Sequence, residues 1–254
     1  ILYATDASAY HEMPLAVTRP ASRDDIKKII AFARSNGTSV IPRGAGTSLA
    51  GQVVGPGIII DISKYLNRIL EFNREERWIR VEPGVIPGEL NKYLAQYGLQ
   101  FGPETSTANR CCMGGMLGNN SCGLHSLIHG SVRDHILEVE AILSDGSEVL
   151  FRSLTTDEFR KKCDGDPEVL ETGIYRNLRD TLSDTHNATE IRKEFPHPKL
   201  RRRNNGYALD SLLETDPFTG NGERINVCRL LAGSEGTLAF TTAMKVNLVP
   251  LAEG

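Results

Sequence analysis

Apolar side chains along this chain recur with two periods, one typical of helices and one typical of strands. In residues 22–37 the apolar positions at helical spacing are Ile26, Ile29, Ile30 and Ala33. This spacing predicts a helix with one apolar face; Ser22 and Asp25 form a capping-box pattern at its start, and Gly37 suits its end. The same reasoning predicts helices over residues 87–97, 113–119 and 167–183, and another that begins at the Thr155-x-x-Glu158 pattern.

Short apolar runs bounded by polar or turn-forming residues predict strands. These runs occupy residues 40–42, 58–61, 69–72, 78–81, 136–143, 147–151 and 237–249. Asp145-Gly146, between two of them, is a strong hairpin signal, whereas residues 184–203 are polar and expected to be irregular and residues 213–223 are expected to form a loop. We therefore expect an α+β fold of two lobes, an N-terminal lobe over residues 1–102 and a C-terminal lobe over residues 103–254.

The composition agrees with a compact domain and limits the classes of partner. The chain has 254 residues, 40% of them hydrophobic, which is enough to bury a core. Its 29 Lys and Arg against 32 Asp and Glu give a net charge of −3, which argues against nucleic acid as a partner. The chain has no long apolar run and no signal-peptide pattern, so we expect no transmembrane segment and a cytoplasmic location, with peripheral contact at the inner membrane left open. Its five cysteines form no Cys-x-x-Cys pair, so we expect free thiols and no metal site.

Two glycine-rich segments, residues 43–51 and 114–123, are the strongest candidates for chemistry. Glycine lets the backbone adopt positive φ and has no Cβ, so successive N–H groups can converge on an anion such as a pyrophosphate. Two known phosphate motifs do not fit, because Leu49 stands where the dinucleotide fingerprint needs its third glycine and no Gly-Lys-Ser/Thr sequence forms a P-loop. A glycine-rich loop without any ligand therefore remains an alternative at this point.

A family resemblance decides between these interpretations. Motifs that carry it, in family order, include Arg43-Gly44-Ala45-Gly46-Thr47-Ser48, Val81-Glu82-Pro83-Gly84-Val85 and Gly233-Ser234-Glu235-Gly236-Thr237-Leu238. Through them the chain resembles the FAD-binding domain of the FAD-linked oxidases, the vanillyl-alcohol-oxidase or PCMH-type superfamily. Within it the chain is most similar to the group of D-lactate dehydrogenase, the glycolate oxidase D-subunit and D-2-hydroxyglutarate dehydrogenase. Residues 201–210 also resemble the large members of that group that are fused to an iron–sulfur region.

The resemblance implies a PCMH-type FAD-binding fold with FAD between the two lobes. Backbone amides of residues 44–48 would hold its pyrophosphate, helped by Arg43 and by the N-terminus of helix 113–119. The implied cofactor contacts are Pro42, Arg43, Gly44, Ala45, Gly46, Thr47, Ser48, Pro103, Glu104, Thr105, Ser106, Gly114, Gly115, Asn119, Ser121, Gly123, Val139, Glu235 and Gly236. Relatives that bond the flavin covalently through the first segment have a histidine at the position of Thr47, so non-covalent FAD is expected here.

The activity implied by the resemblance is oxidation of a D-2-hydroxy acid to the 2-oxo acid by hydride transfer to flavin N5. The substrate would be of the D-lactate, glycolate or 2-hydroxyglutarate class, and an iron–sulfur domain or subunit is one candidate electron acceptor. In the family a substrate-binding cap domain follows this point of the chain, so the catalytic residues stay unassigned and the chain alone is expected to be inactive. Two alternatives remain, an FAD-binding module without turnover and an NADPH-using reductase of the cell-wall-precursor type.

Two polar clusters are weaker candidates for chemistry. His125, His129 and His135 surround the second glycine segment, and a histidine can act as a base near neutral pH. We favour packed or exposed histidines, because the sequence shows no group that would orient a catalytic one. The basic run over residues 199–203 suits either a solvated loop or the attraction of a carboxylate substrate, and both remain open.

Overall fold

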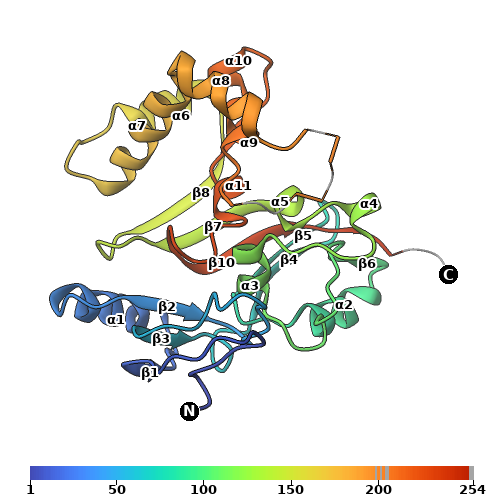
Figure 1. The fold of residues 1–254 in the computed structure, drawn as a ribbon. Coiled ribbons are helices and arrows are strands. Elements are labelled where there is room, and N and C mark those ends of the chain that lie inside the picture. Colours follow the sequence, from blue (N-terminus) through green and yellow to red (C-terminus); the bar gives the residue numbers. More distant parts are fainter. Residues whose placement is uncertain (198, 201, 204–205, 252–254) are drawn as a thin grey trace.

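The computed structural model describes residues 1–197, 199–200, 202–203 and 206–251 (Figure 1). Its strands are β1 (Ala16–Thr18), β2 (Val40–Arg43), β3 (Ile58–Asp61), β4 (Ile69–Asn73), β5 (Trp78–Val81), β6 (Leu99–Gln100), β7 (Ile136–Ile142), β8 (Glu148–Leu154), β9 (Ile225–Asn226), β10 (Phe240–Asn247) and β11 (Val249–Pro250). Its helices are α1 (Arg23–Ser35), α2 (Pro87–Ala95), α3 (Met113–Asn119), α4 (Ser126–His129), α5 (Val132–His135), α6 (Thr156–Cys163), α7 (Leu170–Ser183), α8 (Thr185–Glu194), α9 (Leu209–Leu213), α10 (Asp216–Thr219) and α11 (Cys228–Leu231).

The N-terminal part forms a three-stranded parallel sheet in the order β1-β3-β2, with α1 beside it at the bottom of the view (Figure 1). The central strand β3 is buried along its whole length. Helix α1 begins as predicted, because the Ser22 side chain accepts from the Asp25 amide and the Asp25 side chain accepts from the backbone at Ser22. Gly37 has a φ of +60°, the left-handed conformation expected after the helix.

A six-stranded antiparallel sheet in the order β4-β5-β10-β7-β8-β9 forms the larger part of the fold. Strand β10 lies inside it, and Met244 pairs with Val81 of β5 on one side and with Val139 of β7 on the other. The predicted hairpins β4–β5 and β7–β8 are both confirmed. The first hairpin lies within residues 1–102, but its strands belong to the sheet that is otherwise built from residues after 102. The boundary between lobes at residue 102 stays a prediction.

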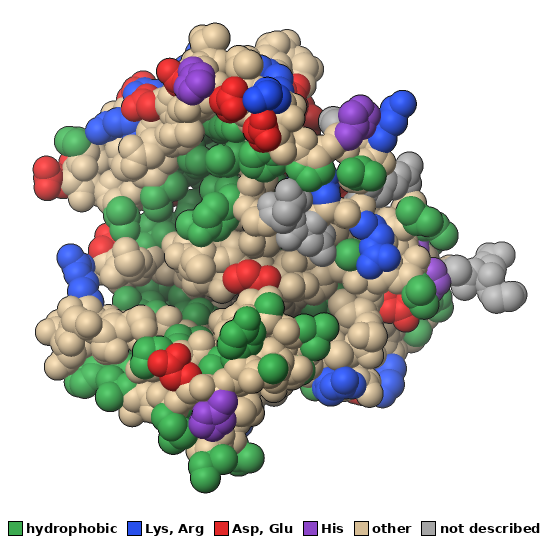
Figure 2. Space-filling model, viewed as in Figure 1, with side chains coloured by type: hydrophobic (Ala, Val, Ile, Leu, Met, Phe, Trp, Pro, Cys, Tyr) green, Lys and Arg blue, Asp and Glu red, His purple; other side chains and the backbone are tan. Residues whose placement is uncertain are grey.

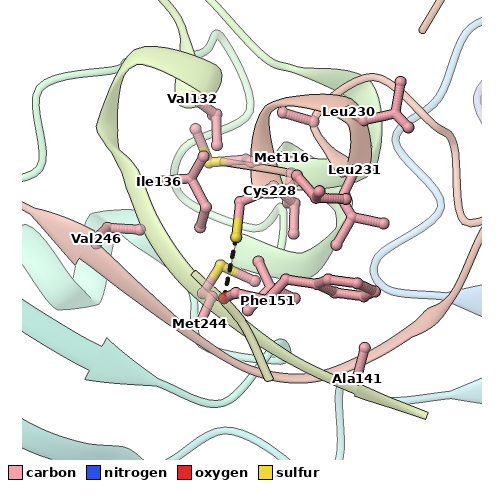
Figure 3. Packing of buried hydrophobic residues seen from close by; sticks show 14 of the residues in the cluster. Met116, Val132, Ile136, Ala141, Phe151, Cys228, Leu230, Leu231, Met244 and Val246 are labelled. Atoms are coloured by element: carbon pink, nitrogen blue, oxygen red, sulfur yellow. Dashed lines mark hydrogen bonds between the residues drawn. The ribbon is translucent and has the colours of Figure 1, made fainter. Parts of the chain in front are cut away.

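A hydrophobic core fixes helices α3 and α11 against this sheet (Figure 3). Met116 of α3 and Cys228 of α11 pack with Phe151 of β8 and Met244 of β10, all with at most 2% of their surface exposed. The Cys228 thiol donates to the carbonyl oxygen of Phe151 at 3.2 Å, the contact drawn in Figure 3. The second glycine segment is therefore attached through α3 to the larger of the two hydrophobic clusters.

A smaller cluster joins the two sheets. Ile26 and Ile30 of α1 pack with Ile60 of β3, with Cys112 just before α3 and with Phe240 at the start of β10. Burial of these side chains removes apolar surface from water, which favours one fixed arrangement of the two parts. This apolar contact therefore holds the three-stranded sheet and the six-stranded sheet together.

Two predictions for the region between α7 and β9 are wrong. Residues 184–203 were expected to be irregular, but α8 occupies Thr185–Glu194 and begins where the Asp184 side chain accepts from the Asn187 amide. Only Ile191 of this helix is buried, so its apolar residues form no periodic face that a sequence pattern could reveal. Helix α10 likewise lies inside the predicted loop 213–223, and α7 begins at Leu170 rather than at residue 167.

Candidate functional site

A cavity of about 470 Å³ lies between the loop after β2, helix α3 and the segment before β10. These three segments are far apart in the sequence, and Figure 2 shows the surface hollowed between the parts that hold the two sheets. The volume falls in the range of small-molecule and cofactor sites, which are mostly apolar with a few convergent polar groups. The cavity therefore has the size and the position of a ligand site.

The cavity brings together most of the residues that the sequence suggested. Those that line it are Pro42, Arg43, Gly44, Ala45, Gly46, Thr47, Ser48, Thr105, Ser106, Gly114, Gly115, Asn119, Ser121, Glu235 and Gly236. Pro103, Glu104, Gly123 and Val139 do not line it. Val139 is fully buried within β7, and Gly123 packs so closely against the carbonyl of Glu104 that no Cβ could fit.

In the first glycine loop, residues 43–51, some backbone N–H groups have no hydrogen-bond acceptor among the described residues. Within the described residues, the amides of Gly46, Thr47 and Ser48 donate to no protein acceptor, and Gly46 has a φ of +65°. The Ala45 amide is used differently, since it donates to the Cys112 sulfur. Consecutive N–H groups with a left-handed residue among them form a concave anion-binding nest.

Two side chains of this loop are hydrogen-bonded to residues near the N-terminus. Arg43 has 8% of its surface exposed, and its guanidinium donates to the carbonyl oxygens of Tyr3 at 3.2 Å and Thr5 at 2.7 Å. The Ser48 hydroxyl donates to the Asp6 carboxylate at 3.1 Å. Arg43 still places a positive charge at the cavity wall, but its hydrogen bonds hold the N-terminal residues.

The second glycine segment supplies space at the start of α3, where two backbone donors are already used. The amides of Met113 and Gly114 donate to the carbonyl oxygens of Val85 at 2.9 Å and Pro83 at 2.7 Å, so they are not available to an anion. Gly115 is different, because a Cβ built on it would meet no described atom within 4 Å. Since Gly115 also lines the cavity, the space beside it is free for a ligand.

The turn before β10 closes the third side of the cavity. Glu235 has a φ of +51° and Gly236 a φ of +76°, and the Glu235 amide donates to the Gly118 carbonyl at 2.9 Å. The Asn119 side chain donates to the Glu235 carboxylate at 3.1 Å. Burial raises the pKa of the Glu235 carboxyl, and hydrogen bonds from Asn119 and Gln52 offset part of that effect. The carboxylate thus links this turn to α3 and to the loop after β2.

Sequence reasoning did not assign the apolar floor of the cavity. Cys111, Cys112 and Phe240 line it, with 5%, 3% and 4% of their surfaces exposed. Burial raises the pKa of the Cys112 thiol to about 11, so it stays protonated and packs as a small apolar side chain. The adjacent cysteines were visible in the sequence, whereas Phe240 carried only a strand pattern.

The three histidines lie outside the cavity. The Nδ1 atom of His125 lies 2.7 Å from the Glu104 carboxylate, and Nε2 of the buried His135 lies 2.6 Å from the carbonyl oxygen of His129. Burial lowers the pKa of His129, and its two histidine neighbours lower it further. The His125 contact holds the Glu104 side chain, and the His135 contact holds the backbone at His129.

The basic run over residues 199–203 is only partly described, because Arg201 lies outside the described residues. Arg203 forms an ion pair with Asp210. Among the described helices none is long and apolar enough to cross a membrane.

An α+β fold with a glycine nest and an open cavity between its two larger sheets defines a domain that binds an anionic cofactor. The FAD binding domain family matches residues 14–151. The chain belongs to the FAD-linked oxidase family, and its cofactor is FAD. The amides of Gly46, Thr47 and Ser48 and the space beside Gly115 fit that cofactor.

Curated relatives agree with this assignment. The chain is 38% identical over 251 residues to D-2-hydroxyglutarate dehydrogenase of Pantoea ananatis and 35% identical over 251 residues to the enzyme of that name in Pseudomonas putida, covering 98% of this chain in each case. It is 32% identical to the glycolate oxidase subunit GlcD of Bacillus subtilis over 58% of this chain and 32% of the relative. The chain spans only 24% of the length of the two dehydrogenases.

Solved structures confirm the expected PCMH-type fold. An alkyldihydroxyacetonephosphate synthase matches with a TM-score of 0.60 over 94% of this chain and 32% of its own chain. The sequence identity is 17%, so this likeness concerns the fold alone.

Proposed function

We propose that this chain is the FAD-binding part of an enzyme that oxidises a D-2-hydroxy acid to the corresponding 2-oxo acid. The supporting relatives are the two D-2-hydroxyglutarate dehydrogenases, which match along almost the whole chain. The proposal rests on one observation. The amides of Gly46, Thr47 and Ser48, which have no acceptor among the described residues, and the open space at Gly115 all lie in one cavity. FAD, when bound, supplies the two-electron redox chemistry that amino-acid side chains lack.

The roles of the chain's own residues follow from their positions. Amides of Gly46, Thr47 and Ser48 hold the pyrophosphate, and Gly115 leaves room for the body of the cofactor. The apolar floor, which includes Phe240, excludes water and strengthens these hydrogen bonds because the local dielectric is low. Thr47 has no imidazole with which to bond the flavin, so FAD is held non-covalently.

The remaining parts of the activity are proposed for the longer protein that the relatives represent. The residues that bind the hydroxy acid and take its proton would lie in a cap domain, and electrons would pass to an acceptor such as an iron–sulfur domain or subunit. The division into lobes 1–102 and 103–254 with FAD between them, and a location in the cytoplasm with or without peripheral membrane contact, belong to the same proposal.

The proposal predicts that a side chain at position 115 displaces FAD without harming the fold. Gly115→Leu places a side chain in open space inside α3, and leucine favours a helix over glycine by up to about 1 kcal/mol. We expect the melting temperature of the apoprotein to be unchanged or higher, and the dissociation constant for FAD, measured by flavin fluorescence, to rise at least about 100-fold, or about 2.7 kcal/mol.

Gly173→Leu is the matched control for this variant. Gly173 lies inside α7, a Cβ there also meets no described atom within 4 Å, and the residue does not line the cavity. The control should keep the FAD affinity of the unmodified chain. Equal FAD affinity for Gly115→Leu and Gly173→Leu would show that the cofactor lies elsewhere.

In the full-length enzyme, anaerobic bleaching of the flavin by a D-2-hydroxy acid tests the proposed substrate class. Bleaching by NADPH instead would identify a reductase on the same fold.

A further inference from the structure

Residues 3–10, here called the N-terminal segment, run along the first glycine loop and lie outside residues 14–151 matched by the FAD binding domain family. The Ala7 amide donates to the carbonyl oxygen of Gly46 at 3.1 Å. The family match therefore does not include this segment. The segment nevertheless contacts the first glycine loop at Gly46, whose own amide has no acceptor among the described residues.

The N-terminal segment contacts the loop at both ends as well as at its centre. At the start of the loop, the Arg43 guanidinium donates to the carbonyls of Tyr3 and Thr5 and lies 5.1 Å from the centre of the Tyr3 ring. At the end of the loop, a Cβ on Gly51 would stand only 2.9 Å from Cδ2 of Tyr10, so the backbone passes directly against that ring.

The segment is itself attached to the three-stranded sheet. The Tyr3 hydroxyl donates to the Asp61 carboxylate of β3 at 2.6 Å, and Arg19 contacts both groups. Hydrogen bonds from Ser63 and Tyr3 lower the pKa of Asp61 against the effect of its burial, which alone would raise it. The carboxylate therefore stays ionised at neutral pH and holds Tyr3 in place.

The hydrogen bond from the Ala7 amide to the Gly46 carbonyl oxygen fixes the orientation of the peptide group between Gly46 and Thr47. The carbonyl of Gly46 and the N–H of Thr47 belong to one planar peptide group, and in a trans peptide they point in opposite directions. No cis peptide occurs among the described residues. Because the Ala7 amide holds the carbonyl on the side of the N-terminal segment, the Thr47 N–H points to the other side, and Thr47 lines the cavity.

We propose that the N-terminal segment is a positioning element for FAD, which fixes the Gly46–Thr47 peptide so that its N–H faces the pyrophosphate. This inference rests on the proposed placement of FAD against the first glycine loop. A loop without the segment would sample other orientations of this peptide. The apparent affinity for FAD would then fall in proportion to the fraction of molecules with the correct one.

A pair of proline variants tests the contact at Gly46. Ala7→Pro removes the N–H that donates to Gly46, and we expect the dissociation constant for FAD to rise about tenfold, which corresponds to about 1.4 kcal/mol. Ala9→Pro is the control, because Ala9 is exposed and its amide donates to no acceptor in the described part of the chain. Equal affinity of the two variants for FAD would overturn the inference.

Variants of Asp6 separate positioning from charge. Asp6→Asn keeps an acceptor for the Ser48 hydroxyl and should bind FAD at least as well as the unmodified chain, whereas Asp6→Ala should weaken binding about tenfold. Tighter binding by both variants would mean that Asp6 acts only by repelling the pyrophosphate. Glu12→Ala is the control for loss of an acidic side chain, because Glu12 has no side-chain partner among the residues described.

Hydrogen exchange in the unmodified chain gives a test that needs no variant. If the ordered segment favours FAD binding, bound FAD must favour the ordered segment by the same factor, so exchange at the Ala7 amide should slow by about tenfold on adding FAD. Absence of any FAD binding would contradict the proposed function itself. Binding with unchanged exchange at Ala7 would overturn only the positioning role.

Discussion

At the scale of single residues, two tyrosines differ in whether their hydroxyl groups have hydrogen-bond partners. The Tyr175 side chain is fully buried, and its hydroxyl has no hydrogen-bond partner within the described residues. The Tyr3 hydroxyl instead donates to Asp61 and accepts from Arg19. A buried polar group without a partner costs free energy, whereas a satisfied one contributes a modest net gain.

The same substitution should therefore have opposite effects at these two positions. We expect Tyr175→Phe to raise the free energy of unfolding by about 1 kcal/mol, and Tyr3→Phe to lower it by about 1 kcal/mol. Urea titration of the apoprotein measures both values. A loss of stability in Tyr175→Phe would mean that a partner such as an internal water satisfies this hydroxyl.

The sequence predicted the glycines that line the cavity but not the direction of its polar side chains. Positive φ at Gly46 and open space at Gly115 are properties of glycine itself, so a pattern of glycines is informative. Arg43 and Ser48 donate to residues 3–6, which are distant in sequence and follow no pattern. Their assignment needed the folded structure.

At the scale of elements, local capping signals identified helices that apolar spacing alone would miss. Helix α6 begins as its sequence predicts, with Thr155 accepting from the Glu158 amide and the Glu158 carboxylate accepting from the Thr155 amide. The backbone hydrogen bond from Thr155, with further help from Arg152, lowers the pKa of Glu158 to about 2. Helix α8 was missed because its single buried residue produces no period.

The cap of α6 predicts a measurable loss of stability and a pH dependence. Thr155→Ala should lower the free energy of unfolding by about 1 kcal/mol. Folding lowers the pKa of Glu158 below its ordinary value. The ionised carboxylate therefore stabilises the fold at any pH above that ordinary pKa. This contribution disappears as the pH falls toward about 2.

Chemical denaturation of the unmodified chain and of Glu158→Gln between pH 2 and pH 7 checks this dependence. The difference between the two proteins should be present at neutral pH and vanish at the acid end. Asp157→Asn is the control in the same helical turn, since the only side-chain partner of Asp157 in the described part of the chain is Arg160, in an exposed pair. The same acid-dependent difference in the control would contradict a specific effect of the cap.

At the scale of the whole molecule, one strand decides whether the two parts form a single fold. Strand β10 is hydrogen-bonded to β5 on one side and to β7 on the other, and Phe240 at its start belongs to the cluster that joins the sheets. The longer strands could be predicted from their apolar runs, whereas the short strands β1, β6 and β9 were not. The order of the strands could not be predicted, because it depends on pairing between residues far apart in sequence.

Interruption of β10 should therefore destroy both sheet and cavity. Met244→Pro removes a donor in the centre of the sheet, and we expect loss of the cooperative thermal transition together with FAD binding. Val17→Pro in the edge strand β1 is the comparison, and it should lower the melting temperature while keeping a cooperative transition. A cooperative melt in Met244→Pro at the temperature of the unmodified chain would contradict this role of β10.

The position of β10 also sets an order of events during synthesis on the ribosome. Strands β5 and β7 emerge long before β10. One edge of β5 stays unpaired until β10 is synthesised about 160 residues later, a delay on the order of ten seconds at typical translation rates. Until then the hairpin β4–β5 has an unpaired edge of the kind that chaperones cover. The wall of the cavity formed by residues 234–241 is made in the same late interval, so the proposed flavin site is complete only after β10 has left the ribosome.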